Sequence, residues 1–244
     1  DFNLKNLMEL EKRHKPERII IEYNGMWNIK DLKLPIHWRI EQQITTIDAT
    51  TFPMYYTNMK SQLSEMLRKP EMIIMNRCDG IEDLGSYKRN MKALNQRADI
   101  ILENKDGEVD EIFEDDLPYS LDTKELDLDD SSYGIWYLDS LDHLERYEGK
   151  TLSFVAQVLI PPGFDPKYFV PGRKVMTCCA EDMTFLGFPC KYEGAGQLKN
   201  KQWVKVKATV HREYWKDFEG EGPVLHAISV EPCKAPREEI ISFS

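Results

Sequence analysis

The chain has 244 residues, a formal net charge of −10 and a hydrophobic content of 41%. This length suits two ordinary domains, and no run approaches the roughly 20 apolar residues that span a bilayer. The negative charge argues against general nucleic-acid binding, which needs a basic surface. Five cysteines, an odd number, do not make a disulfide framework, so we expect a reducing, cytoplasmic location.

The first hundred residues alternate between two kinds of apolar pattern. Short β-branched runs are typical of strands buried on both faces, and runs with helical spacing lie between them. The pattern predicts, in chain order, a helix at residues 3–14, strands at 18–22 and 40–48, a helix at 55–68, a strand at 72–75, a helix at 83–96 and a strand at 98–102. Such alternation indicates parallel β/α units, in which ligands bind at the carboxyl ends of the strands.

Polar residues follow three of the predicted strands directly. Glu22, Asp48 and Asn76 each stand where an apolar run ends. Because parallel strands place their carboxyl ends at one edge of a sheet, we expect these residues at the same edge. Asp48 has an alternative role as a helix cap or turn former, and Glu22 as a surface carboxylate.

The tetrapeptide Asn76-Arg77-Cys78-Asp79 follows the buried run at 72–75. An Asp at such a position can accept two hydrogen bonds from the N1–H and amino group of guanine, and a charge-assisted pair of this kind is strong. The asparagine orients the loop, and a long basic side chain covers a face of the base, here the planar guanidinium of Arg77. The alternative is that Asn76 and Asp79 simply cap the following helix.

Four segments in order favour the first interpretation. Residues 22–25 (Glu-Tyr-Asn-Gly), 48–49 (Asp-Ala), 76–79 (Asn-Arg-Cys-Asp) and 95–98 (Asn-Gln-Arg-Ala) resemble successive motifs of the CobW/HypB/UreG GTPases. In the last segment Gln96 stands where that family has proline. The resemblance covers about residues 1–102.

The resemblance implies GTP as ligand, with Mg²⁺, and implies a role for each matched residue. Asn76 and Asp79 would read guanine, Arg77 would cover the base, Asn95 would lie in the segment that closes over it, Glu22 would hold Mg²⁺ through water, Gly25 would lie beside the γ-phosphate, and Asp48 would support the site. Glu22 and Gly25 are thus the candidate catalytic positions.

A phosphate-binding loop is missing from the sequence. The motif Gly-x-x-x-x-Gly-Lys-Ser/Thr, which cradles the β-phosphate and holds Mg²⁺, occurs nowhere in the 244 residues, nor does the Cys-x-Cys-Cys motif that the family places after it. We expect either a truncation before Asp1 or a separate polypeptide that carries the missing half. The chain alone is then predicted to be inactive, and its uncovered sheet edge and apolar surface to be prone to association.

The segment at residues 103–147 is predicted to be an acidic, partly ordered linker. Thirteen Asp or Glu residues against two lysines fall between positions 103 and 130, so the rest of the chain is nearly neutral. Two apolar islands, Ile112-Phe113 and Ile135-Trp136-Tyr137, interrupt it and are expected to dock it.

Residues 148–244 have the alternation of short antiparallel strands. Runs at 151–158, 203–210 and 225–230 are separated by glycines and prolines, which predicts an all-β, OB-like barrel. The segments 171–183, 187–190 and 202–204 resemble the C-terminal domain of uncharacterised bacterial permease subunits. The acidic residues of 211–222 argue against nucleic acid as a partner of this domain, in spite of its aromatic residues.

Thiol and imidazole groups in the C-terminal segment raise the question of metal. Cys178, Cys179 and Cys190 are the candidate Zn²⁺ ligands, with Cys233, His211 and His226 as further donors. The spacing is not that of a zinc ribbon, and adjacent cysteines on a strand point to opposite faces. A role as small core side chains is the alternative.

Taken together, the sequence predicts a partial P-loop GTPase sheet (1–102), an acidic linker (103–147) and an OB-like barrel (148–244). The predicted function is the guanine-nucleotide-binding portion of a CobW-like GTPase in metal trafficking, with a protein partner or metal client, no nucleic acid and no membrane span. The alternative is a non-enzymatic interaction or metal-binding module that docks on a partner through the barrel.

Overall fold

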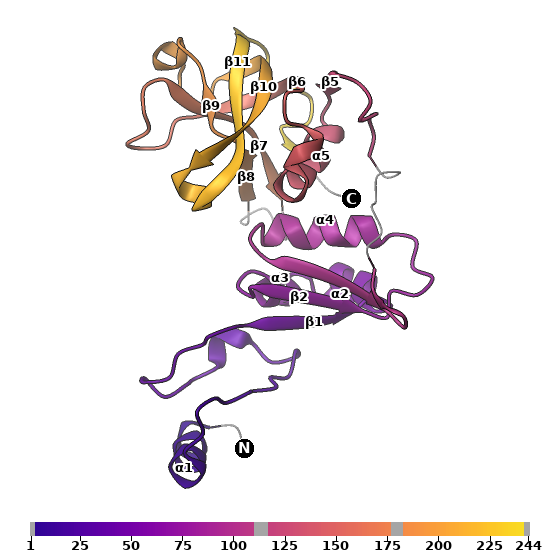
Figure 1. Cartoon of the computed structure of the whole chain (residues 1–244), viewed down its shortest axis with the longest axis vertical. Helices are drawn as coiled ribbons and strands as arrows, with labels where there is room; N and C mark the ends of the chain where they lie inside the picture. Colours follow the sequence, from indigo (N-terminus) through magenta and orange to yellow (C-terminus); the bar gives the residue numbers. More distant parts are fainter. Residues whose placement is uncertain (1–2, 110–116, 177–182, 242–244) are drawn as a thin grey trace. The chain divides into compact units, whose positions relative to one another are not determined.

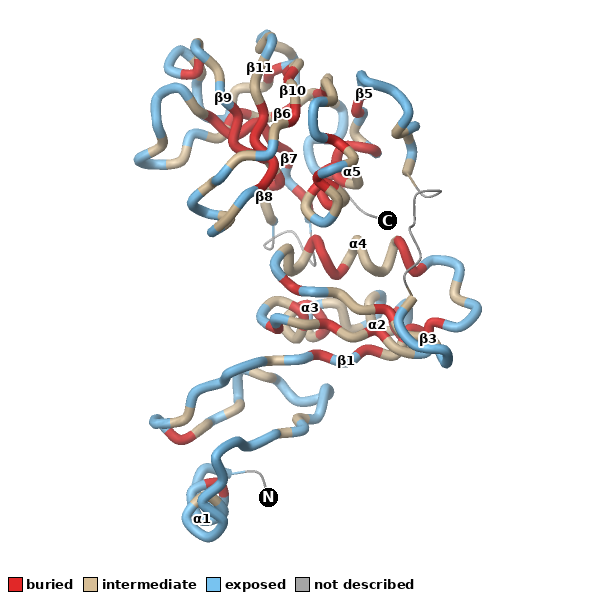
Figure 2. Tube along the Cα trace, in the orientation of Figure 1, coloured by how far each residue is buried: buried red, intermediate tan, exposed pale blue. Residues whose placement is uncertain are grey.

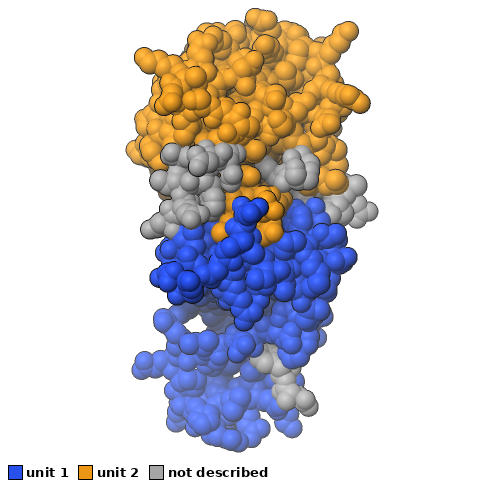
Figure 3. Space-filling model, turned by 90° about the vertical axis from the view of Figure 1, so that its right-hand side faces the viewer, with its two compact units in different colours: residues 1–82, 97–109 blue, residues 83–96, 110–244 orange. Residues whose placement is uncertain are grey.

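The computed structural model describes residues 3–109, 117–176 and 183–241. The chain divides into two compact units, shown in Figure 3. Unit 1 comprises Asp1–Glu82 and Arg97–Val109, and unit 2 comprises Asp83–Gln96 and Asp110–Ser244. None of the helices in the described ranges is long and apolar enough to span a bilayer.

Unit 1 contains a four-stranded sheet in the order β1-β2-β3-β4 (Figure 1). Its strands are β1 (Ile44–Asp48), β2 (Met72–Asn76), β3 (Asp99–Asn104) and β4 (Gly107–Glu108). The first three are parallel, and β4 returns antiparallel to β3. The β-branched run of β2 is the buried centre, with Ile73 and Met75 fully enclosed. The predicted parallel β/α arrangement of this segment is confirmed.

Two short helices stand where one was predicted between β1 and β2. These are α2 (Phe52–Asn58) and α3 (Lys60–Leu67), separated at Met59, whose φ is −129°. The Asn58 side chain donates to the carbonyl oxygen of Met54 at 2.9 Å. Such a local side-chain bond competes with the backbone ladder at the end of a turn, which favours a break here.

The strand predicted at residues 18–22 does not form. The segment between α1 (Leu4–His14) and β1 has no strand, only a short 3₁₀ turn at Ile29–Asp31. Ile20 is 92% exposed, and Figure 2 shows exposed residues along most of this stretch. A strand needs a neighbour for its backbone groups, and β1, its expected neighbour, pairs within the described residues with β2 alone. The local sequence indicates the apolar run, but it does not show that the run lacks a neighbouring strand to pair with.

Exposed apolar side chains are frequent in the same segment. Ile36 is fully exposed, and the other large apolar residues exposed here are Ile19, Ile20, Met26, Trp27, Ile40 and Ile44. A monomeric surface rarely exposes so many large apolar residues close together in sequence.

Unit 2 is built on an eight-stranded, mostly antiparallel sheet with the order β12-β7-β9-β11-β10-β6-β5, in which β8 pairs with β7. The strands are β5 (Glu125–Leu128), β6 (Thr151–Leu159), β7 (Tyr168–Met176), β8 (Met183–Gly187), β9 (Cys190–Lys191), β10 (Trp203–Trp215), β11 (Gly220–Pro232) and β12 (Ile240–Ile241). Its helices are α4 (Leu84–Leu94) and α5 (Ser132–Asp142). Among the residues of this unit that the structure describes, 3₁₀ turns lie at Leu144–Arg146, Ala195–Gln197 and Lys216–Phe218.

A closed OB-like barrel is not confirmed for this unit. The alternation of β6 and β10 correctly predicts strands with one buried face, with Ala208 and Val210 fully enclosed. The alternation of buried and exposed residues along a strand does not determine whether the sheet closes into a barrel, however. In the structure β7 has four partners, β6, β8, β9 and β12, which gives a large sheet with added strands.

The acidic segment expected as a linker contributes core elements to unit 2. β5 pairs parallel to β6, and α5 buries its aromatic side chains. Trp136 lies 5.4 Å from Phe188 and 5.8 Å from Phe154 between ring centroids. The predicted apolar island at 135–137 therefore docks as a helix, while Ile112-Phe113 lies outside the described residues.

Helix α4, predicted as part of the nucleotide-binding half, clusters with unit 2. Lys92 on α4 forms an ion pair with Asp142 on α5 at 2.7 Å. The hydroxyl of Tyr137 on α5 donates to the side-chain oxygen of Gln96 at 3.2 Å. These contacts join α4 and the residue Gln96 that follows it to α5 of the C-terminal unit.

Candidate nucleotide-binding site

The carboxyl ends of β1 and β2 bring Asp48 and Asn76, two of the predicted polar residues, together. Asp48 and Asn76 are partners in the parallel register, each the last residue of its strand. Arg77 and Asp79 follow in the loop after β2. Parallel pairing of two apolar runs of equal length is the reason that residues 28 positions apart share this edge.

Asp48 is held by a turn of its own. Its Oδ1 accepts from the hydroxyl of Thr50 at 2.6 Å and from the backbone N–H of Thr50 at 2.9 Å. Its Oδ2 accepts from Nη1 of Arg77 at 2.6 Å. These bonds, above all that from the Thr50 hydroxyl, lower the pKa of Asp48 below its usual value. Asp48 is thus a fixed, ionised carboxylate at the strand end.

Arg77 adopts an uncommon backbone conformation in the loop. Its φ is 57°, in the left-handed region that costs energy for a residue with a Cβ. The turn directs its guanidinium to Asp48, although its side chain is 72% exposed. Arg77 therefore binds the carboxylate of Asp48 at the end of the neighbouring strand.

Cys78 anchors the loop beneath the exposed residues. It is buried, its backbone N–H donates to the Glu103 carbonyl at 3.0 Å, and its thiol donates to the Met75 carbonyl at 3.3 Å. Burial raises the pKa of the thiol above its usual value, so it stays protonated and can donate. Cys78 fastens the loop to β2 and β3.

Asp79 presents a carboxylate on the exposed side of this loop. Its Oδ2 accepts from the backbone N–H of Lys105 at 3.2 Å, in the turn that joins β3 to β4. Asn76 begins the same tetrapeptide, and its Oδ1 is buried without a hydrogen-bond partner among the described residues. Buried polar atoms are normally paired, so this amide oxygen has unused acceptor capacity.

Glu22 and Gly25 lie in the irregular segment before β1. Glu22 is exposed, and Gly25 and Met26 offer their carbonyl oxygens to Nε2 of Gln62 at 3.3 and 2.8 Å. A pocket of about 450 Å³ lies next to this turn, between residues 26–30 and 61–66. No hydrogen bond or ion pair in the described part of the chain joins Glu22 or Gly25 to the strand-end residues.

Asn95 ends helix α4, where its backbone N–H donates to the Met91 carbonyl. It belongs to unit 2, whereas Asp48, Asn76, Arg77 and Asp79 belong to unit 1. Its role beside a base stays a prediction.

The candidate cysteine ligands divide into two groups. Cys178 and Cys179 lie outside the described residues. Cys190, on β9, is fully buried, and burial raises its pKa far above the usual range for a thiol. A metal ligand must be the thiolate, which such burial disfavours. Cys190 therefore has the surroundings of a core side chain.

Sequence reasoning missed Thr50 and Lys105, which hold the two carboxylates. Both had a signal. Asp48-Ala49-Thr50 has the spacing of a turn in which an Asp side chain accepts from the residue two positions later. Asn104-Lys105-Asp106-Gly107 contains the Asp-Gly pair typical of a tight hairpin turn.

Comparison with known families divides the chain close to the boundary between β3 and β4. The family model described as the DUF1980 C-terminal domain matches residues 104–241. The model described as the CobW/HypB/UreG nucleotide-binding domain matches residues 2–102. No curated protein matches the chain.

A solved structure that matches is the crystal structure of "a putative aspartyl-tRNA synthetase" from Leishmania major Friedlin. The two are 15% identical with a TM-score of 0.27, over 44% of this chain and 20% of that chain. A likeness this low supports no argument about fold or function.

Proposed function

We propose that residues 2–102 of this chain form the guanine-reading part of a GTP site. The chain belongs to the DUF1980 C-terminal domain family and begins with a CobW/HypB/UreG nucleotide-binding domain. The observation that carries the proposal is the loop after β2. Asp79 is exposed there, and the Lys105 N–H holds its Oδ2. A carboxylate held in this way is ready to accept from the N1–H and amino group of guanine, a pair of donors that adenine lacks.

Three neighbours support this assignment. Asn76 has a buried amide oxygen with acceptor capacity to spare. Cys78 fixes the loop through Glu103 and Met75, so the carboxylate is positioned before a base arrives. Arg77 can cover the base if its exposed guanidinium leaves Asp48, and Asp48 would then face the nucleotide as an ionised group.

Binding of the phosphates is the part of GTP recognition for which this chain on its own is poorly equipped. Tight nucleotide binding depends on backbone amides and cations around the β- and γ-phosphates, and the sequence has no Gly-x-x-x-x-Gly-Lys-Ser/Thr loop. Mg²⁺ prefers oxygen ligands and keeps several waters. Glu22 is an exposed carboxylate that suits such a water-mediated contact. We therefore propose base selection by the 244-residue chain, without tight GTP binding or hydrolysis.

Metal trafficking in a reducing compartment is the process that fits the family. Cys78, Cys190 and Cys233 are free thiols, which suits such a compartment. A protein partner or metal client would complete the work of the intact assembly. The competing role as a non-enzymatic interaction module makes a different prediction, because it requires no preference between bases.

The test is an NMR titration of the ¹⁵N-labelled 244-residue chain with guanosine and adenosine monophosphates. We expect guanosine monophosphate to shift the amides of residues 76–79 and 105, and the adenosine compound to leave them unchanged. Asp79→Asn should abolish the response, because an amide cannot accept from both guanine donors.

Asp106→Asn, in the turn next to Lys105, is the matched control and should retain the response. Equal responses to both nucleotides, or none, would contradict the proposal. A micromolar affinity of the chain for GTP would contradict the part that concerns the phosphates.

A further inference from the structure

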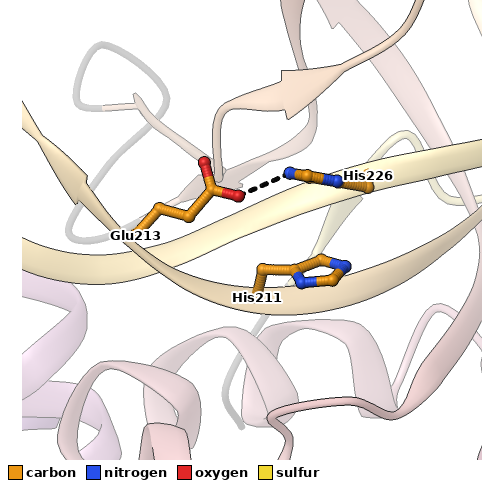
Figure 4. Close-up of side chains that lie close together, drawn as sticks. All are labelled: His211, Glu213 and His226. Atoms are coloured by element: carbon orange, nitrogen blue, oxygen red, sulfur yellow. Dashed lines mark hydrogen bonds and ion pairs between the residues drawn. The ribbon is translucent and has the colours of Figure 1, made fainter.

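Two histidines and a glutamate converge on one face of unit 2 (Figure 4). Thr209, His211 and Glu213 are spaced by two along β10, so their side chains share a face. The opposite face carries the fully buried Ala208 and Val210. His226 lies on β11, directly across from Thr209 in the antiparallel register. Strand pairing therefore joins residues 13 or more positions apart.

The three side chains are within reach of a common ion. One ligand atom from each of His211, Glu213 and His226 lies within 4.8 Å of the others. Nε2 of His226 is 2.6 Å from Oε1 of Glu213, and the two imidazole rings lie 4.1 Å apart between centroids. All three residues are half-buried, so the group remains accessible from solvent.

We propose that His211, Glu213 and His226 form a binding site for a divalent transition metal ion of the Zn²⁺ class. Two imidazoles and a carboxylate are ligands that suit Zn²⁺, with at least one position left for water or a client ligand. Metal–ligand distances of about 2.0–2.2 Å place tetrahedral ligand atoms about 3.3 Å apart. The ligand atoms lie within 4.8 Å of one another, so they need to approach by at most about 1.5 Å to reach this spacing.

Thr209 gives His211 the support that metal-ligating histidines usually have. Its Oγ1 lies 2.8 Å from Nε2 of His211 and, at 3.5 Å, faces the carbonyl oxygen of His226. A hydroxyl that donates to this carbonyl accepts from the Nε2–H of His211, which leaves the lone pair on Nδ1. Ligating histidines commonly donate their other N–H to such a partner, which fixes the tautomer and the ring.

The His226–Glu213 hydrogen bond is what a metal would replace. Glu213 can only accept, so in the metal-free state the proton lies on Nε2 of His226. A bound cation takes the place of this proton between the same two atoms, and the imidazole then stays neutral by carrying its proton on Nδ1. Lys191 pairs with His226 in the β9–β11 register and is exposed, so its ammonium can stay in water.

An aromatic cluster stands next to Glu213 along β10. Trp215 follows Glu213 on the same face of β10, and its ring lies 5.2 Å from Tyr168 and 5.5 Å from Phe164.

The test is calorimetric titration of the metal-stripped 244-residue chain with Zn²⁺, together with absorption spectra of the Co²⁺ complex. We expect one ion per chain at this site and a cobalt spectrum without a thiolate-to-metal charge-transfer band, because no cysteine takes part. Glu213→Gln and His226→Gln should each weaken Zn²⁺ binding by at least about a hundredfold, and Thr209→Val by about tenfold.

His143→Gln is the matched control, because His143 has a glutamate partner of its own, Glu145 at 3.6 Å, outside the cluster. It should leave Zn²⁺ affinity unchanged. Circular dichroism checks the fold of each variant, and Glu213→Gln, nearly isosteric, serves as the reference should His226→Gln alter it. Absence of Zn²⁺ binding, unchanged affinity in Glu213→Gln, or a thiolate band would overturn the proposal. The readout does not involve nucleotide, so it stands or falls apart from guanine recognition.

Discussion

Arg77 donates to Asp48 at 2.6 Å across the carboxyl ends of β2 and β1. The contact depends on the left-handed backbone of Arg77, which turns its side chain toward the neighbouring strand. The residue expected to cover a base is therefore engaged with a strand-end carboxylate. Any nucleotide that recruits Arg77 must compete with this pair.

The left-handed conformation of Arg77 predicts a difference between two substitutions. Arg77→Gly and Arg77→Ala both remove the pair with Asp48, but only alanine retains the steric cost at φ 57°. We expect the glycine variant to be more stable than the alanine variant by about 1 kcal/mol in urea denaturation. Lys201, with φ 68°, offers the same comparison without an Asp48 partner and should show the same sign. Equal stability of the two Arg77 variants would count against the backbone argument.

Asp129 predicts a pH dependence of stability. Its Oδ1 accepts from the hydroxyl and N–H groups of Ser131 and Ser132 at the start of α5. These bonds, first that from the Ser131 hydroxyl, lower its pKa to about 2. Because the folded-state pKa is lowered, the stabilisation is complete above the ordinary Asp value near 4 and is lost as pH falls toward about 2.

We expect Asp129→Asn to cost about 1 kcal/mol at pH 7, after allowance for solvent screening of an exposed group, and progressively less below about pH 4. Asp127→Asn, on the exposed face of β5, removes the same charge without the capping bonds. Denaturation curves at pH 7, 4 and 2.5 provide the measurement. A difference from wild type that is as large at pH 2.5 as at pH 7 would refute the assignment.

Trp136 tests whether the acidic segment belongs to the core. Its side chain is fully buried among Tyr133, Phe154 and Phe188. Trp136→Ala should cost about 3–5 kcal/mol in the unfolding free energy of unit 2, followed by near-UV circular dichroism. Trp136→Phe should cost less, since it keeps a ring and removes a buried indole N–H without a partner in the described residues. A linker residue would show almost no effect in either variant.

The described cysteines are expected to react with iodoacetamide in order of exposure. Cys233 is half-buried, whereas Cys78 and Cys190 are buried. Burial raises the pKa of Cys190 most strongly, and the thiolate is the reactive form. Peptide mass spectrometry should find Cys233 modified first and Cys190 at least about a hundredfold more slowly. In urea the rates should converge, and rapid modification of Cys190 in the native chain would contradict its place in the core.

Several features of unit 1 followed from the sequence. The apolar runs of β2 and β3 are continuous and flanked by helical patterns, which is enough to indicate parallel strands. Parallel strands share a carboxyl edge, so the positions of Asp48 and Asn76 at that edge were predictable as well. Glu22, expected beside them, lies in a segment that forms no strand. Local periodicity carries this information because a strand buried on both faces has to be apolar at every position.

Other features needed contacts that no local pattern contains. The run at 19–21 has the composition of a strand, yet it lacks a pairing partner and stays exposed. The aromatic island of α5 is surrounded by acidic residues, and only its packing against Phe154 and Phe188 shows that it belongs to the core.

The sequence by itself determined which segments form the central strands of unit 1 and which polar residues end them, because both depend on side-chain type along a few consecutive residues. The tertiary structure alone decided that Arg77 pairs with Asp48 and that His226 meets His211 and Glu213. The register of the paired strands determines these side-chain contacts. It is fixed by the summed packing of two whole strands, so no short stretch of sequence specifies it.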